Sequence, residues 1–437
     1  MTERKVVEEL KRLITTIHNH YENTEEISGA RISTEDDRIV TLSVRDYGLT
    51  TLPDSLGELS KLQMLDLTGN RLTALPESLK NLPELRKIYL DDNQFTVFPD
   101  VLTSLLDLEE IHLDRNRLAS LPPDLEQLER LRVLNVYGNE LVAVPENIGG
   151  LRELRELSVG RNRLTDLPEA LWKLSGLEVL NVAENGLAAV SERLGELTRL
   201  RMLDLAHNGL SALPGSLGKL TNLTDYLYLS NNHLTILPPS LGNLTKLRYL
   251  NVTDNQLTAL PESIGKMTGL KELRLYNNKV TTLPESCGEI VNLVELHAQN
   301  NRLAALPTSI GGLARLKKLD LSGNQLTALP ESIGTLASLS SLDLRDNKLA
   351  VLPASIDGLS NLRSLDLRNN RLTTLPASIG MLKSLTFLDL RANKLTILPS
   401  EIGELTSLEK LDLRWNKLFF MPQMIKKLEE QDCIIFM

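Results

Sequence analysis

The sequence predicts an α/β solenoid, in which stacked coils each contribute one short strand to a parallel sheet. Three observations indicate this fold class: an Asn recurs every 23 residues within the pattern LxxLxLxxNxLxxLP, leucines stand at fixed offsets around it, and no linker rich in Pro, Gly or Ser interrupts the 437-residue chain. Self-similarity at a fixed period is typical of repeat proteins whose coils stack on their neighbours. The recurring amides, with one 24-residue step before Asn232, are Asn70, Asn93, Asn116, Asn139, Asn162, Asn185, Asn208, Asn232, Asn255, Asn278, Asn301, Asn324, Asn347, Asn370, Asn393 and Asn416.

Each coil has the same order of elements, which the coil around Asn70 illustrates. The alternation Leu65-Asp66-Leu67 predicts a short strand with its leucines inside and its polar residue on the open face. Asn70 follows where the chain turns out of the strand, and we expect its amide to donate to and accept from backbone groups of the turn. Stacked copies then form a ladder. Pro76 ends the extended run, so the return arm is predicted to be irregular or a single helical turn.

The ends of the stack need covers, because a bare terminal coil would expose apolar surface and strand edges. Residues 1–38 are assigned to an N-terminal helical cap and hairpin, 39–430 to seventeen repeats, and 431–437 to a C-terminal cap strand. The alternative for the N-terminal helix is a role in binding a partner.

The N-terminal cap is predicted to contain a helix over residues 3–18 and a hairpin with strands over 31–34 and 38–44. In the C-terminal tail, Ile434 and Phe436 occupy strand positions. The apolar face of the helix would carry Val6, Leu10, Leu13, Ile14 and Ile17.

These motifs resemble the leucine-rich repeat family in its typical 23-residue class. The phrase LPxxIGxLxxLxxLxLxxNxL, as in residues 260–278 and 329–347, is most similar to the intracellular Ras-group leucine-rich repeat proteins and their bacterial relatives. The resemblance implies a horseshoe with about 17 short strands on a concave parallel sheet and an irregular or 3-10 convex side. It also implies signalling partners such as small GTPases or phosphatases, although no residue identifies one. Function is left open, because the same fold serves many partners.

Composition and charge restrict the classes of partner. The formal net charge of -9 and the pI near 5.4 argue against general binding to nucleic acid or to anionic membranes. The start of the chain lacks an apolar signal-peptide core, and the chain has no uninterrupted apolar segment of about 20 residues. Cys287 and Cys433 do not form the cysteine clusters of extracellular caps. We therefore expect a cytoplasmic monomer.

Side chains on the open face of the sheet form columns that run from strand to strand, and three zones stand out. Coils 3 to 5 form the first aromatic zone, coils 9 to 12 the second aromatic zone, and coils 14 to 17 the charged stripe. The first contains Tyr89, His112 and Tyr137 with Asp91 and Asp114; the second contains Tyr228, Tyr249, Arg274, Tyr276 and His297; the stripe contains columns of Asp beside Arg345, Arg368, Arg391 and Arg414, followed by Trp415.

The second aromatic zone is the preferred contact site, because Tyr and Arg dominate binding hot spots. The alternative is that its rings only pack on one another. For the charged stripe, one interpretation is mutual neutralisation of the Asp and Arg columns. The other is a docking surface for a partner of alternating charge. Tyr226 is an extra residue beside the second zone, and it is either a tolerated slip or the cause of a local bend.

No catalytic, cofactor-binding or metal site is expected. His112 and His297 share a column but are separated by eight coils, about 38 Å at strand spacing. Our interpretation is a non-catalytic protein–protein interaction scaffold that binds a protein partner on its concave face, with a role in intracellular signalling. The alternative is a bacterial effector that acts on host proteins by binding, and an enzyme is the third hypothesis.

Overall fold

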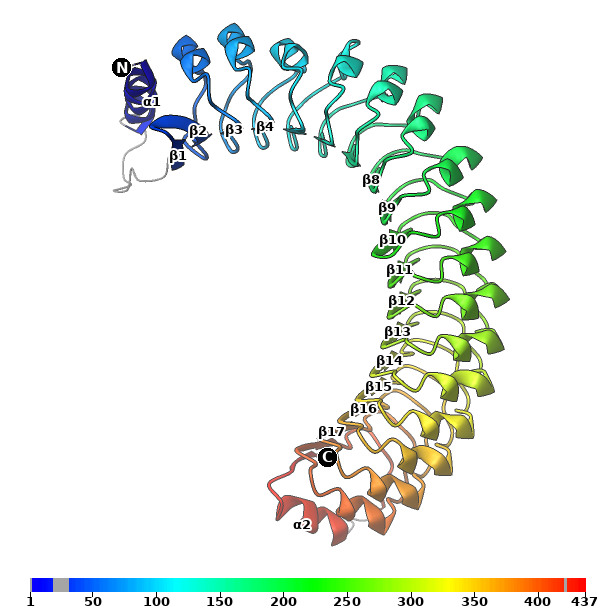
Figure 1. Cartoon of the computed structure of the whole chain (residues 1–437). Helices are drawn as coiled ribbons and strands as arrows, with labels where there is room; N and C mark the ends of the chain where they lie inside the picture. The colour runs from blue at the N-terminus through cyan, green and yellow to red at the C-terminus, as the bar shows by residue number, and fades with distance from the viewer. Residues whose placement is uncertain (1, 19–30, 420–422) are drawn as a thin grey trace. The chain divides into compact units, whose positions relative to one another are not determined.

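The computed structural model describes residues 2–18, 31–419 and 423–437. The chain divides into two compact units, an N-terminal unit, Met1–Gly209, and a C-terminal unit, Leu210–Met437. Within each unit, short strands line the inner side of the coils and 3-10 helices lie on the outer side (Figure 1).

The N-terminal unit begins with helix α1 (Thr2–His18) and an antiparallel hairpin of β1 (Arg31–Glu35) and β2 (Arg38–Ser43). From β2 onward, neighbouring strands pair parallel and in register. These strands are β3 (Met64–Asp66), β4 (Lys87–Tyr89), β5 (Glu110–His112), β6 (Val133–Asn135), β7 (Glu156–Ser158), β8 (Val179–Asn181) and β9 (Met202–Asp204). The 3-10 helices are η1 (Asp54–Glu58), η2 (Glu77–Asn81), η3 (Asp100–Ser104), η4 (Leu125–Gln127), η5 (Glu146–Gly150), η6 (Glu169–Lys173) and η7 (Glu192–Glu196).

The C-terminal unit repeats the same pattern in a parallel, in-register sheet. Its strands are β10 (Tyr226–Tyr228), β11 (Tyr249–Asn251), β12 (Glu272–Arg274), β13 (Glu295–His297), β14 (Lys318–Asp320), β15 (Ser341–Asp343), β16 (Ser364–Asp366), β17 (Phe387–Asp389), β18 (Lys410–Asp412) and β19 (Ile434–Phe436). Its helical elements are η8 (Gly215–Lys219), η9 (Pro239–Asn243), η10 (Glu262–Lys266), η11 (Glu285–Glu289), η12 (Thr308–Gly312), η13 (Glu331–Thr335), η14 (Ala354–Gly358), η15 (Ala377–Met381), η16 (Ser400–Glu404) and α2 (Gln423–Glu429).

Prolines set the start of most 3-10 helices. Pro76 precedes η2 with φ -69° and ψ 140°, an extended conformation that suits the fixed φ of the proline ring. Helix η7 follows Ser191 instead, whose side chain accepts a hydrogen bond from the backbone N–H of Arg193 at 3.2 Å. The serine therefore caps the helix where the proline is missing.

At several outer turns, neighbouring coils lie so close that glycine is required. A Cβ atom on Gly288 would lie 2.1 Å from the backbone oxygen of Ser309 in the next coil, and one on Gly265 would lie 2.4 Å from that of Ser286. No other side chain fits at these distances. The glycine of the repeat's IG dipeptide therefore stands where the backbones of neighbouring coils are in contact.

The motif leucines form the core of every coil. Leu65, Leu67 and Leu72 are fully buried in the coil around Asn70, and the equivalent leucines are buried throughout both units. Each fully buried leucine contributes about 1.5 to 3 kcal/mol relative to an exposed one. Stacking thus produces one continuous apolar core within each unit.

Helix α1 covers the first coil of the N-terminal unit. Val6 and Leu10 are buried, and the Glu3 carboxylate accepts hydrogen bonds from the backbone N–H of Ile39 at 3.0 Å and from Arg38 Nε at 2.7 Å. The side chains of Ile14 and Ile17 lie outside the described residues. These contacts between α1 and the first coil favour a role of the helix as a cap.

The C-terminal end contains one element that the sequence analysis missed. Strand β19 pairs with β18 as the tail pattern predicted, but α2 precedes it with Ile425 and Leu428 buried. Their three-residue spacing is a helical signal. The repeat pattern predicts this stretch only as the end of the last repeat.

The predicted fold class is confirmed: the chain is an α/β solenoid with short parallel strands, 3-10 return arms and an N-terminal helix. The extra residue near Tyr226 leaves the strand register intact, because Tyr226 pairs with Tyr249 and Asp225 forms a bend just before β10. Across the described parts of the chain, no helix is both long and apolar enough to cross a membrane.

Candidate functional site

The recurring amides hold the turns that follow each strand. Asn324 illustrates this: its Oδ1 accepts from the backbone N–H of Leu303 at 3.0 Å, and its Nδ2 donates to the carbonyl oxygens of Ala298 at 2.9 Å and Leu321 at 3.0 Å. All sixteen amides accept from a backbone N–H of the preceding coil and donate to a carbonyl of their own coil. The ladder therefore fixes the backbone beside the open face.

The residue before each recurring amide adopts a left-handed backbone. Asn277, Asn300 and Asn369 have φ of 55°, 54° and 55°, and Gly323 has 64°. Asn, Asp and Gly tolerate this region best, which explains their frequency at this position. Trp415 also adopts it, with φ 62°, although an indole gains nothing from the conformation. The turns thus present a second column of side chains beside the strand columns.

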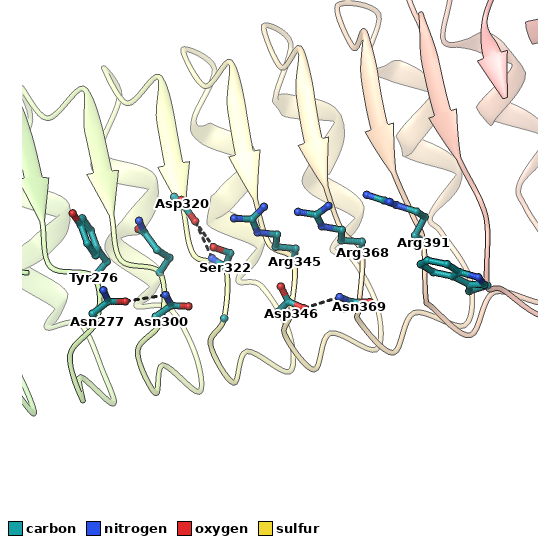
Figure 2. A pocket seen from close by; sticks show the side chains of 13 residues that line it. Tyr276, Asn277, Asn300, Asp320, Ser322, Arg345, Asp346, Arg368, Asn369 and Arg391 are labelled. Atoms are coloured by element: carbon teal, nitrogen blue, oxygen red, sulfur yellow. Dashed lines mark hydrogen bonds between the residues drawn. The ribbon is translucent and has the colours of Figure 1, made fainter. Parts of the chain in front are cut away.

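A groove of about 630 Å³ runs along these two columns in the C-terminal unit. Figure 2 shows side chains from successive strands and turns lining it. The lining residues are Tyr276, Asn277, Gln299, Asn300, Asp320, Ser322, Gly323, Arg345, Asp346, Arg368, Asn369, Arg391 and Trp415. The groove therefore joins part of the second aromatic zone to the charged stripe, two sets that the sequence analysis kept separate.

One wall of the groove is an amide and carboxylate chain. Asn300 Nδ2 donates to Asn277 Oδ1 at 2.8 Å, and Asn369 Nδ2 donates to Asp346 Oδ1 at 2.7 Å (Figure 2). On the facing column, Ser322 Oγ donates to Asp320 Oδ1 at 2.7 Å. Among the residues that the structure describes, none forms a hydrogen bond with the buried Oε1 atom of Gln299. This wall can therefore recognise amide groups of a ligand.

The arginines of the charged stripe pair with the aspartates of their own strands. Arg391 Nη2 lies 2.5 Å from Asp389 Oδ2, and Arg414 Nη2 lies 2.6 Å from Asp412 Oδ2. The stripe thus contains the mutual neutralisation expected by one of the two interpretations of the sequence.

The pairing is looser nearer the middle of the groove. Arg345 Nε lies 3.5 Å from Asp343 Oδ2, and Arg368 Nε lies 3.4 Å from Asp366 Oδ2. Burial raises the pKa of Asp343 to about 6, and the neighbouring Asp320 and Asp366 carboxylates also raise it. Burial raises the pKa of Asp366 as well. The two central arginines therefore keep donors for a ligand.

The second aromatic zone divides into two parts. Tyr226, Tyr228 and Tyr249 form a ring cluster with centroids 5.3 to 5.5 Å apart. The Arg274 guanidinium lies 5.4 Å from the centroid of the Tyr249 ring. Burial raises the pKa of Tyr249 to about 12. Tyr276 instead lines the groove.

His297 lies in the same zone but is 7% exposed, with Nε2 2.9 Å from Glu295 Oε2. Together with Glu272 these residues bring ligand atoms within 4.8 Å of one another, so they could hold a metal ion. However, Arg274 Nε donates to Glu272 Oε1 at 2.6 Å, so an ion-pair network already explains the cluster.

The first aromatic zone lies in the N-terminal unit, and its side chains contact one another and residues of neighbouring coils. The rings of Tyr89 and His112 stack at 4.5 Å, and Tyr137 Oη donates to Glu184 at 2.5 Å. Asp91 and Asp114 each accept a backbone N–H of the next coil at 2.7 Å. Burial and the Asp91 charge raise the pKa of Asp114 to about 6. The groove is formed by other residues.

Sequence reasoning missed the turn column of the groove. Apart from Trp415, it considers only strand positions, whereas Asn277, Asn300, Asp346 and Asn369 stand one residue before the recurring amides. The available signal was the repeated Asn, Asp or Gly at that position, which favours a left-handed turn. Gln299 and Ser322 were in the strand columns but carried no distinguishing pattern.

Comparisons with known proteins agree with this geometry. The chain matches the family described as Leucine-rich repeat region over residues 40–143, 111–236, 228–321 and 356–432, and the one described as Leucine rich repeat over 306–349. A leucine-rich repeat protein of Leptospira interrogans is similar in structure, with 35% identity and a TM-score of 0.75, covering 92% of this chain and 96% of that one. No curated protein sequence matches the chain.

Two further solved structures are similar. The plant peptide hormone receptor RGFR1 in complex with RGF2 has 27% identity and a TM-score of 0.69, covering 91% of this chain and 77% of that one. YopM from Yersinia enterocolitica has 27% identity and a TM-score of 0.56, covering 87% and 83%. With the amide ladder, the in-register parallel strands and the matched segments from residue 40 to residue 432, these similarities show that the chain belongs to the leucine-rich repeat family.

Proposed function

We propose that the protein is a non-catalytic interaction scaffold that binds a protein partner in the concave groove of the C-terminal unit, between Tyr276 and Trp415. The observation that carries the proposal is the continuous groove, whose ends are aromatic and whose middle holds loosely paired arginines. Aromatic and Arg side chains contribute most of the energy at protein interfaces. Trp415 is 72% exposed at one end of the groove, where its indole can pack against a partner.

The similar proteins support binding rather than catalysis. RGFR1, whose structure was solved in complex with RGF2, shares this fold over most of its length. We propose a cytoplasmic, monomeric signalling scaffold, because the chain lacks the cysteine clusters of extracellular caps and its repeats resemble those of the intracellular Ras-group proteins. The second candidate is a bacterial effector that binds host proteins, and it is favoured by the similarity to proteins of Leptospira and Yersinia.

A photocrosslinking experiment tests the proposed surface. Benzoylphenylalanine replaces Tyr276 in the groove, and a matched variant carries it at Met381, which is exposed on the outer helix η15. Irradiation in native cytosol and, separately, in host-cell lysate should give crosslinked proteins at position 276 that are absent at position 381.

The crosslinked protein is then purified and its affinity measured. A Kd weakened at least about tenfold by Tyr276→Ala, with unchanged melting, would support the groove as its site. Equal crosslinking at both positions would refute the proposal. Products found only in host lysate would favour the effector.

A further inference from the structure

We infer that the groove receives an extended acidic segment of the protein partner, about nine residues long, with one or two Asp or Glu side chains bound by Arg345 and Arg368. The inference rests on the proposed function and adds the chemistry of the ligand to it. Its grounds are the unused hydrogen-bond donors of Arg345 and Arg368, the amide side chain of Gln299 in the groove lining, and the length and ends of the groove.

The two arginines in the middle of the groove have donors to spare. Arg391 makes three hydrogen bonds to Asp389, and Arg414 makes two side-chain bonds to Asp412. By contrast, among the residues that the structure describes, neither Arg345 nor Arg368 donates a side-chain hydrogen bond, and each keeps one ion contact of 3.4 Å or more. A guanidinium carries five N–H donors, so most of those on these two residues are free for a ligand.

These two guanidinium groups are arranged to share one anionic group. Arg345 and Arg368 lie on neighbouring strands, β15 and β16, whose Cα partners are in register. Figure 2 shows their side chains side by side and aimed the same way. At the strand spacing of about 4.8 Å, a carboxylate between them can accept hydrogen bonds from both.

A carboxylate suits this position better than a phosphate. Asp343 lies 3.5 Å from Arg345 and Asp366 lies 3.4 Å from Arg368, and burial and neighbouring carboxylates already raise the pKa values of both aspartates. A second full negative charge would meet that repulsion, because a phosphomonoester carries close to two charges at neutral pH. A carboxylate brings a single negative charge, so the net charge of the two arginines, the two aspartates and the ligand stays closer to zero.

The rest of the groove suits the main chain of an extended segment. Gln299 lines the groove, and its side-chain amide can pair with main-chain groups of a ligand. From Tyr276 to Trp415 the groove spans six strand steps, about 29 Å, which an extended chain covers with about nine residues. The exposed indole of Trp415 offers an apolar contact at one end.

A library of random nonapeptides displayed on phage tests the inference with the full-length protein. Selection on wild type should enrich Asp and Glu about tenfold or more at one or two central positions, since charge-assisted hydrogen bonds are worth at least that factor. The variant Arg345→Gln with Arg368→Gln should lose the enrichment. The control is Arg302→Gln with Arg371→Gln, which removes the same charge from exposed sites outside the groove and should keep it.

Synthetic peptides from the selection then separate the alternatives by fluorescence anisotropy. Replacing the central Glu by phosphoserine should weaken binding, and tighter binding of the phosphopeptide would overturn the inference. Absence of acidic enrichment, equal enrichment in the Arg345→Gln, Arg368→Gln variant, or a crosslink from position 276 to a second copy of this chain would also overturn it. If a protein is crosslinked at position 276 but peptides show no acidic preference, the proposed function stands and only the ligand chemistry is wrong.

Discussion

The amide ladder gives the most direct test of how the repeat is stabilised, and Asn255→Ala is its clearest perturbation. Asn255 is 7% exposed. Its Oδ1 accepts from the Leu234 N–H at 3.0 Å, and its Nδ2 donates to the carbonyls of Leu229, Val252 and Thr253 at 2.9 to 3.2 Å. Removing the amide leaves one N–H buried without a partner, at a cost of about 1 to 3 kcal/mol. The three carbonyl oxygens can accept hydrogen bonds from other donors, so losing the Asn255 amide at these oxygens adds less to the cost.

We therefore expect Asn255→Ala to lower the free energy of unfolding of the C-terminal unit by about 2 to 3 kcal/mol. Urea unfolding of the full chain measures it, and hydrogen exchange of the Leu234 amide shows whether the loss is local. The matched control is Asn361→Ala, an exposed Asn with a single hydrogen bond to Ala337, which should change stability by less than about 0.5 kcal/mol. Equal unfolding curves for the two variants, or unchanged exchange at Leu234, would refute the ladder reasoning.

Three further predictions follow from individual side chains. Because burial raises the folded-state pKa of Asp343 to about 6 from 3.8, its ionisation lowers stability as pH rises from 3.8 to about 6; Asp343→Asn should therefore raise the free energy of unfolding measured in urea near pH 8 by about 1 kcal/mol after allowance for solvent screening, but leave it nearly unchanged at a pH about one unit below 3.8. Trp415→Asn relieves a left-handed backbone that suits Asn, so it should stabilise the protein by about 0.5 to 1 kcal/mol while weakening the partner protein in a binding titration; loss of stability would contradict the strain. Gly288→Ala should destabilise by about 2 to 3 kcal/mol in thermal unfolding, because its Cβ would lie 2.1 Å from the Ser309 oxygen, whereas Gly209→Ala, with its nearest contact at 3.4 Å, should be tolerated.

The candidate site was predictable only in part. The strand columns placed Tyr276, Arg345 and Arg368 on the open face, since side chains two apart along a strand share a face. The same rule could not show that Arg345 is loosely paired while Arg391 is tightly paired, because both stand two residues after an Asp. Nor could it show that His297 is buried against Glu295.

The sequence alone determined the coil. A 23-residue spacing of Leu and Asn admits few backbones that bury the leucines and satisfy the turn, so strand, amide turn and 3-10 return arm follow from the pattern. The tertiary structure decided which exposed side chains form a site. Stacking brings residues 23 positions apart into contact, and whether a guanidinium then bonds to its own strand or faces open space depends on side-chain geometry that repeat spacing does not encode.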